Sequence, residues 1–171
     1  MHPLGLFHYC PKCGSSHFKD HDFKSRKCAD CGFTFYLNPS AATAAFILND
    51  KNQLLIARRL KDPAKGTYDL PGGFTDLNET AEEAIIREIK EETSLSLSNP
   101  KYLFSLPNIY LYSGFEVHTV DLFFEFRLNN DPVLQPADDV SELFFLTKDA
   151  IDPAKFGLTS IRKAIEIWLS S

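Results

Sequence analysis

The sequence predicts an α/β (α+β) protein in which helices cover a mixed sheet, preceded by a small separate unit. Two observations predict this arrangement. From residue 41 onward, strand-like runs, one helical segment, further strand-like runs and a final helix follow one another. All four cysteines lie in the first fifth of the chain, where aliphatic residues are almost absent. We therefore expect a cysteine-rich unit over residues 1–36 and a larger domain over residues 41–171.

The composition limits the classes of protein to which the chain can belong. Of its 171 residues, 44% are hydrophobic and 24% are charged, which is typical of a water-soluble protein with one sizeable core. No apolar run approaches the ~20 residues that span a bilayer, and no basic stretch followed by an apolar run begins the chain. We therefore expect a cytoplasmic protein without membrane contact. The formal net charge of -5 argues against nonspecific binding along nucleic acid.

The larger domain is predicted to contain several strands and two helices. Six segments have the composition of strands, and they cover residues 41–48, 53–59, 67–70, 102–112, 116–128 and 142–146. The first two are expected to form a hairpin around a turn. Pro71-Gly72-Gly73 ends the third strand. Helical periodicity is present over residues 80–93 and again over residues 159–169, where the spacing is that of an amphipathic closing helix.

The four cysteines form two C-x2-C pairs. The pairs are Cys10-Pro-Lys-Cys13-Gly and Cys28-Ala-Asp-Cys31-Gly, with fourteen residues between them. Thiolates from two such pairs can bind one Zn²⁺ tetrahedrally, and a glycine after each pair lets backbone amides turn toward the sulfurs. Two disulfides or four free thiols are the alternatives, but residues 9–36 have too few aliphatic side chains for a core. We predict a structural zinc ribbon, since four thiolates leave no position open for water.

The helix predicted over residues 80–93 has glutamates on its apolar face. Thr80 and Glu83 have the spacing of a capping box, which places the start of the helix at Thr80. At ~100° per residue the apolar side chains form one stripe, which consists of Ala81, Ala84, Ile85 and Ile89. Glu88 and Glu92 fall within that stripe. Carboxylates there are costly unless a cation compensates them, so we expect a cation beside this helix.

Three carboxylates are predicted to converge near the end of the same helix. Glu88 and Glu92 are four residues apart, and Glu91 is three residues after Glu88. Carboxylate oxygens are hard ligands that suit Mg²⁺ or Mn²⁺. Arg87 precedes Glu91 by four residues and can pair with it, which would hold the cluster in shape. A solvated, glutamate-rich helix is the alternative, and we adopt it for the remaining glutamates of the helix.

The stretch from Gly73 to Leu95 resembles the Nudix box, G-x5-E-x7-R-E-U-x-E-E-x-G-U, in which U is aliphatic. The matching positions are Gly73, Glu79, Arg87, Glu88, Ile89, Glu91, Glu92 and Leu95. Ser94 stands where the family has glycine, and a serine at a left-handed helix cap would be mildly strained. The resemblance extends from about Ala41 to the C-terminus. It implies a Nudix alpha/beta/alpha sandwich with a mixed sheet and a loop-helix-loop catalytic motif.

The resemblance also implies a metal-dependent pyrophosphohydrolase and assigns roles to several residues. Glu88 and Glu92 would bind Mg²⁺ or Mn²⁺, Glu91 would join them, and a backbone carbonyl of Gly72 or Gly73 would add an oxygen ligand. The metal would screen the diphosphate charge while an activated water attacks one phosphorus. No covalent intermediate would form.

A general base must remove the proton of the attacking water. Glu88 is the first candidate, and Glu142, just ahead of a predicted strand, is the second, with Asp138 and Asp139 behind it. For these last three residues a solvated loop charge is an equal alternative. Arg87 is expected to support the catalytic glutamates structurally.

The expected substrate is a nucleotide-type small molecule with a phosphoanhydride bond. A zinc ribbon before such a domain is similar to the NADH pyrophosphatase group, but the S-Q-P-W-P-F-P-x-S element of that group is absent, and we expect no extra N-terminal domain. NADH, ADP-ribose and nucleotide sugars are therefore all candidates. The candidate substrate-binding residues are Arg58, Tyr68, Tyr110 and Tyr112. Together with Phe115, the tyrosines offer rings for a nucleobase, with core packing as the alternative.

Two other hypotheses concern the cysteine-rich unit. In one, the protein is a nonhydrolytic nucleotide sensor or a nucleic-acid adaptor whose ribbon contacts RNA or DNA through a small excess of lysine and arginine. All glutamates of the box are present, which favours hydrolysis. In the other, the ribbon supports a homodimer interface.

Overall fold

The computed structural model describes residues 2–129 and 132–171, apart from the side chain of Tyr110. The chain divides into two compact units, Met1–Pro39 and Ser40–Ser171. The bounds expected from the sequence were residues 1–36 and 41–171, with a linker between them. Among the described residues, no helix has the length and apolar character needed to cross a membrane.

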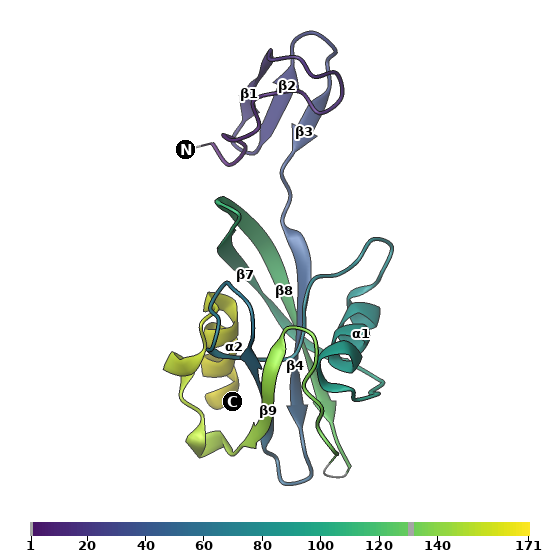
Figure 1. Cartoon of the computed structure of the whole chain (residues 1–171), viewed down its shortest axis with the longest axis vertical. Coiled ribbons are helices and arrows are strands. Elements are labelled where there is room, and N and C mark those ends of the chain that lie inside the picture. The colour runs from purple at the N-terminus through teal and green to yellow at the C-terminus, as the bar shows by residue number, and fades with distance from the viewer. Residues whose placement is uncertain (1, 130–131) are drawn as a thin grey trace. The chain divides into compact units, whose positions relative to one another are not determined.

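The first unit contains a three-stranded antiparallel sheet (Figure 1). Its strands are β1 (Phe18–Asp22), β2 (Ser25–Cys28) and β3 (Thr34–Tyr36), in the order β1-β2-β3. Its buried core consists of Cys10, Phe18 and Cys28, with Cys31, Phe33 and Phe35 packed against them. This core is very small, so the unit depends on its cysteines for stability.

The second unit contains a six-stranded mixed sheet. Its strands are β4 (Ser40–Leu48), β5 (Leu54–Arg59), β6 (Tyr68–Asp69), β7 (Lys101–Tyr112), β8 (Phe115–Arg127) and β9 (Val140–Leu146). The strand order is β6-β5-β4-β8-β7, and β9 pairs with β5. β4 and β8 run parallel, whereas the other neighbours are antiparallel.

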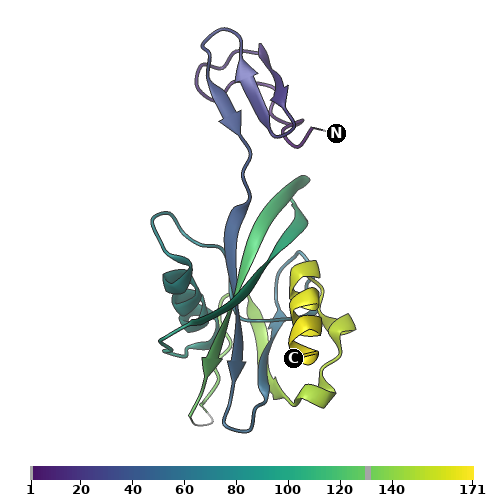
Figure 2. The same ribbon diagram turned by 180° about the vertical axis from the view of Figure 1, so that it is seen from behind.

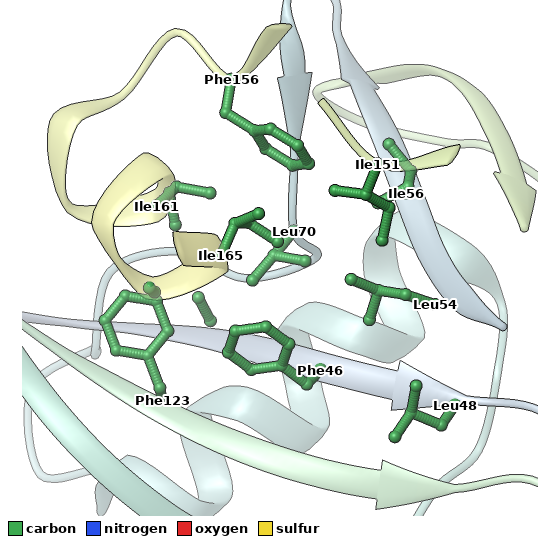
Figure 3. Close-up of a cluster of buried hydrophobic side chains, with 12 residues drawn as sticks. Phe46, Leu48, Leu54, Ile56, Leu70, Phe123, Ile151, Phe156, Ile161 and Ile165 are labelled. Atoms are coloured by element: carbon green, nitrogen blue, oxygen red, sulfur yellow. The ribbon is translucent and has the colours of Figure 1, made fainter. Parts of the chain in front are cut away.

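Two helices cover opposite faces of this sheet, α1 (Ala81–Thr93) and α2 (Thr159–Leu169), as Figures 1 and 2 show. Two short 3-10 helices, η1 (Lys148–Ala150) and η2 (Pro153–Lys155), lead into α2. On β4, Phe46 and Leu48 pack on the α2 side (Figure 3), while Ala45 and Ile47 pack on the α1 side. A strand that is buried on both faces forms the middle layer of a sandwich. The predicted mixed sheet with helices on its faces is therefore confirmed.

The predicted hairpin between residues 41–48 and 53–59 is limited to its turn. Among the described residues, β4 and β5 pair at a single position, Leu48 with Leu54. The edge of β4 beyond that point is occupied by the glycine loop, since the N–H groups of Thr43 and Ala45 donate to the carbonyls of Gly73 and Pro71, both at 2.8 Å. β5 pairs instead with β9 along its length. This opening of the hairpin brings the glycine loop into the sheet.

Helix α1 begins and ends as the sequence predicts. Thr80 and Glu83 form both hydrogen bonds of the capping box, and the helix ends at Ser94, whose φ of 62° and ψ of 10° are left-handed. A non-glycine residue in this region is strained because its Cβ approaches the backbone. Serine is thus tolerated at the position where the Nudix box has glycine, at some cost in stability.

We expect Ser94→Gly to stabilise the second unit by about 0.5–1 kcal/mol, because glycine adopts the left-handed conformation without strain. The greater conformational entropy of glycine in the unfolded chain offsets part of this gain. Urea unfolding of the variant measures this difference. Ser96→Gly is the matched control, since Ser96 is exposed and does not have a positive φ. A loss of stability in Ser94→Gly would contradict the assignment of strain.

Candidate active site

Two glycines allow the loop after β6 to lie against both β4 and α1. Gly72 has a φ of 148°, and a Cβ built on it would come 2.1 Å from the carbonyl oxygen of Thr43. A Cβ on Gly73 would come 2.6 Å from the carboxylate of Glu88. Any side chain at either position would collide with backbone or with that carboxylate. The Gly-Gly pair therefore sets the close approach of this loop to the helix.

Glu92 is a buried carboxylate at the contact between α1 and the glycine loop. Its side chain lies on the face that Ile85 and Ile89 share, and only 7% of the residue is exposed. The N–H of Gly72 donates to its Oε2 at 2.9 Å. Burial raises the pKa of Glu92 well above its ordinary value, and the nearby carboxylates of Asp69 and Glu88 raise it further. An ionised carboxylate in this position needs a cation to compensate it.

Glu88 lies one turn before Glu92 and is held by Arg87. Its side chain is 14% exposed, and its Oε1 accepts from Arg87 Nη1 at 2.8 Å. Burial raises the pKa of Glu88, while the guanidinium opposes that rise. Glu88 and Glu92 therefore place two partly desolvated carboxylates beside Gly72 and Gly73.

Arg87 connects the glutamates of α1 to the preceding loop. Its Nε and Nη2 donate to both carboxylate oxygens of Glu79, at 2.8 and 2.9 Å, and Nη2 also donates to the carbonyl of Phe74 at 3.0 Å. The predicted pair with Glu91 is present at 3.0 Å. The guanidinium lowers the pKa of Glu79 to about 2, mainly through these hydrogen bonds. The sequence analysis matched Glu79 to the box but did not identify it as the partner of Arg87.

We expect Arg87→Lys to destabilise the second unit by about 2 kcal/mol and to lower any turnover, because an ammonium cannot reproduce the fork that holds Glu79 and Glu88 together. Chemical unfolding with the two-state analysis measures the loss. Arg127→Lys, at an exposed site, is the matched control. An unchanged unfolding midpoint in Arg87→Lys would show that the network does not support the helix.

Glu91 and the glycine carbonyls fit the predicted metal shell less closely than Glu88 and Glu92 do. The Glu91 side chain is 48% exposed and pairs with Arg87. The carbonyl of Gly73 accepts from the backbone N–H of Thr43. Among the described residues, the carboxylate oxygens of Glu88, Glu91 and Glu92 are not all within 4.8 Å of one another. Two carboxylates and water still suit Mg²⁺, which commonly keeps several waters.

A cavity of about 300 Å³ opens beside these residues. Gly72, Gly73 and Glu92 line one part of it. Four further carboxylates line it, from the loop before β6, from β6, from β8 and from the segment before β9, namely Asp62, Asp69, Asp121 and Asp139. Burial raises the pKa of Asp69 although Arg59 pairs with it. The volume lies at the lower end of the range for small-molecule sites, so it accommodates part of a nucleotide.

Three of the candidate residues are not part of the described lining of this cavity, namely Arg58 on β5, Tyr68 on β6 and Glu142 on β9. Arg58 pairs with Glu142 at 2.7 Å, and its guanidinium lies 5.0 Å from the centre of the Tyr68 ring. That ring packs edge-on against Phe144. Successive residues of a strand point to opposite faces, so Arg59, the neighbour of Arg58, lines the cavity instead.

The remaining candidates are divided between the cavity and the loops. Tyr112 lines the cavity, whereas the side chain of Tyr110 lies outside the described residues. Asp139 lines it too and pairs with Lys61, which also pairs with Asp138. The sequence analysis did not identify Asp69 or Asp121 as part of the site. The signal for Asp121 was a carboxylate between apolar residues in the middle of a predicted strand.

The four cysteines of the first unit form one cluster. Their sulfur atoms all lie within 4.8 Å of one another, and the pairs Cys10–Cys31 and Cys13–Cys28 are 3.7 Å apart. A disulfide needs about 2 Å. Tetrahedral Zn²⁺ with bonds of about 2.3 Å requires sulfurs about 3.8 Å apart. The donor set and its spacing therefore fit one zinc ion.

Backbone amides support the thiolate form of part of this cluster. The N–H groups of Cys31 and Asp30 lower the pKa of the Cys28 thiol to about 6. The pKa of Cys13 is raised to about 12 although the N–H of Ser15 lowers it, because neighbouring thiols compete for the same protons. A divalent cation is therefore needed to hold all four as thiolates.

The sequence of the chain matches a known domain family and named relatives. Residues 38–166 match the NUDIX domain. An ADP-ribose pyrophosphatase of Methanocaldococcus jannaschii is 48% identical over 63 residues, which are 37% of each chain. The NAD-capped RNA hydrolase NudC of Vibrio atlanticus is 31% identical over 106 residues, which are 62% of this chain and 39% of that one. The matched segments span about two fifths of the length of these relatives.

Solved structures share the fold. A Nudix hydrolase from Nitrosomonas europaea has a TM-score of 0.72 and 20% identity, and the similarity covers 95% of this chain and 90% of that one. The Nudix domain of Shewanella oneidensis NrtR, solved with ADP ribose, has a TM-score of 0.61 and 20% identity over 77% of this chain and 86% of its own. The helix that carries the glutamates, and the Gly-Gly loop beside it, lie within residues 38–166, which match the family model. The chain therefore belongs to the Nudix family.

Proposed function

We propose that this chain hydrolyses a phosphoanhydride bond in a nucleoside diphosphate-linked compound, with ADP-ribose as the first candidate substrate. The observation that carries the proposal is the buried carboxylate of Glu92, which lines the cavity beside Gly72. A carboxylate there is costly without a divalent cation, and Glu88 supplies the second charge that such a cation requires. The name of the Methanocaldococcus jannaschii relative supports ADP-ribose as the first substrate to test.

The residues of α1 would divide the work of the reaction. Glu88 and Glu92 would hold Mg²⁺ or Mn²⁺, with Glu91 at the exposed rim. The bound cation would neutralise the diphosphate oxygens and make water a better nucleophile. Glu88 would accept the proton of the water that attacks one phosphorus, and Arg87 would hold the Glu88 carboxylate in place. The bond from that phosphorus to the bridging oxygen would break, which releases a mononucleotide and a second phosphorylated product.

A second candidate for the general base is Asp139 rather than Glu142. Asp139 lines the cavity, whereas Glu142 pairs with Arg58 and is not part of the described lining. A base must come within hydrogen-bond reach of the water, directly or through one further water. Comparing the pH–rate profiles of Glu88→Gln and Asp139→Asn would identify the base, since loss of the base removes the acidic limb of the profile.

Incubation with a panel of substrates tests the proposed activity. The panel contains ADP-ribose, NADH, nucleotide sugars, dinucleoside polyphosphates, nucleoside triphosphates and NAD-capped RNA, each with Mg²⁺ or Mn²⁺. We expect a mononucleotide from at least one diphosphate-linked member. No turnover of any member, together with tight nucleotide or RNA binding, would favour a nonhydrolytic sensor.

We propose that the first unit is a structural zinc ribbon and that the protein works in a reducing compartment such as the cytoplasm. Four clustered thiols that hold Zn²⁺ are stable where disulfides are reduced. The unit is also the first place to look for a homodimer contact, and light scattering of the full chain with and without residues 1–39 tests that role. An equal number of chains per particle in both samples would exclude it.

A further inference from the structure

The cavity that Glu92 lines also contains a polar side chain that the proposed reaction does not use. Asn108 on β7 is 5% exposed, and it lines the cavity. Its buried Oδ1 has no hydrogen-bond partner among the residues that the structure describes. An unpaired buried amide oxygen is destabilising, so a group that supplies the missing hydrogen bond would be favoured there.

Two described hydroxyl groups on β8 and α2 do not supply that hydrogen bond, because they donate to Asp121. Thr119 lies directly opposite Asn108 in the β7–β8 pair and donates through Oγ1 to Asp121 Oδ1 at 2.5 Å. Ser160 on α2 donates to the other oxygen of Asp121. Asp121 itself lines the cavity and only accepts. This wall of the cavity is therefore rich in acceptors and favours a ligand that donates N–H or O–H groups.

An aromatic ring lies on the same side of β7. Tyr112 follows Asn108 by four residues, so both point to the same face of the strand, and both line the cavity. Tyr112 is 61% exposed, which leaves its ring accessible to a ligand. Leu158 and Ile161 supply apolar surface to the same cavity. An amide, acceptor oxygens and an accessible ring are the elements that recognise a nucleobase with an exocyclic amino group.

We propose that Asn108 is a specificity-determining residue that recognises an adenine-type base, with Tyr112 stacking on it. A side-chain amide pairs with adenine at its amino group and N7, through one acceptor and one donor. Hypoxanthine has a carbonyl in place of the amino group, so it presents an acceptor to a wall of acceptors. The inference rests on the proposed function, which places the diphosphate beside α1. It adds which nucleobase the substrate carries.

The test compares ADP-ribose with its hypoxanthine counterpart in the full-length protein and in Asn108→Leu. We expect the native protein to prefer the adenine compound in kcat/KM by at least about tenfold, as one bidentate base contact provides. Asn108→Leu should lower kcat/KM for ADP-ribose by about 10–100-fold and reduce the preference to within about threefold. Asn38→Leu, at an exposed position in the linker, is the matched control. An unchanged preference in Asn108→Leu would overturn the assignment.

Two further measurements separate this inference from the proposed function and from a structural role. Calorimetric binding of AMP and IMP needs no turnover, so a preference for AMP that disappears in Asn108→Leu supports the inference even if hydrolysis fails. Equal affinities of the native protein for AMP and IMP would overturn it. The thermal midpoint of Asn108→Leu without ligand should be unchanged or higher, because the variant removes an unpaired buried amide. A large fall would assign Asn108 to the fold instead.

Tyr112 is tested in the same assays. Tyr112→Ala should raise KM for both base analogues alike, by about 5–150-fold, since stacking is worth about 1–3 kcal/mol and does not depend on the amino group. Tyr102→Ala is the matched control, because Tyr102 is also exposed on β7 but does not line the cavity. An unchanged KM in Tyr112→Ala would remove the stacking part of the proposal.

Discussion

Replacing Glu92 by glutamine should abolish turnover and, without metal, stabilise the protein. We expect activity to fall by about a thousandfold, because the loss of a charged metal ligand forfeits several kcal/mol of transition-state stabilisation. Glutamine can still accept from the N–H of Gly72, so the loop contact remains. In EDTA the variant should melt at a higher temperature, since it lacks a buried negative charge.

The pH dependence of this stabilisation follows from the sign of the pKa shift. Burial raises the pKa of Glu92 in the folded state above its unfolded value. The native protein therefore loses stability as pH rises through the folded pKa, while Glu92→Gln does not. The two proteins should converge below about pH 4.5, where the carboxylate is protonated in both states.

Thermal melts in EDTA from pH 4 to pH 8, repeated with Mg²⁺, measure both effects. Mg²⁺ should raise the melting temperature of the native protein and leave that of Glu92→Gln unchanged. Glu82→Gln, at an exposed position of the same helix, is the matched control and should behave like the native protein. A Glu92→Gln variant that is less stable than the native protein in EDTA at neutral pH would show that the carboxylate has another role.

Replacing Cys28 by serine should unfold the first unit. Structural zinc contributes about 10–16 kcal/mol of apparent binding free energy in small zinc peptides at neutral pH, and this free energy is folding free energy. The hydrophobic cluster of the unit has three buried residues to replace it, two of them cysteines, and Leu4 is the one other buried hydrophobic residue among the described residues of the unit. Zinc content should fall from one ion per chain to none, and residues 1–39 should become sensitive to protease.

The second unit should survive this change, because the described members of its two core clusters all lie within residues 44–169. Limited proteolysis followed by mass spectrometry should leave a resistant fragment that begins near Ser40. Lys27→Ser, at the exposed neighbouring position, is the matched control and should keep its zinc. Protease resistance of residues 1–39 in Cys28→Ser would contradict a zinc-dependent fold.

Local patterns predicted the strands and the two α-helices of the second unit with small errors at their ends, but not the strands of the first unit or the two 3-10 helices. The capping box fixed the start of α1, because Thr80 and Glu83 satisfy orphan N–H groups within one turn. The C-x2-C spacing predicted the cysteine cluster for the same reason, since each pair is a local unit. Glu92 was placed in the apolar stripe from helical periodicity alone, and the structure buries it there.

Contacts between distant segments could not be read from the sequence. Arg87 was paired with Glu91 by spacing, but its fork also holds Glu79, which lies in the loop before the helix. The cavity combines residues of β4, β5, β7, β8 and α2, so Asn108 and Asp121 meet only after the sheet has formed. Sheet pairing depends on which edges are left free, and the glycine loop occupies the edge of β4 that a simple hairpin would use.

We expect the protein to hydrolyse a diphosphate bond at the face of α1 that carries Glu88 and Glu92, with the help of a divalent cation. The most direct measurement is mass analysis of the products formed from ADP-ribose in ¹⁸O-labelled water with Mg²⁺. The account predicts AMP and ribose 5-phosphate, with one label in one of the two products, from the native protein and from Glu82→Gln but not from Glu92→Gln. Equal product release by Glu92→Gln would contradict it.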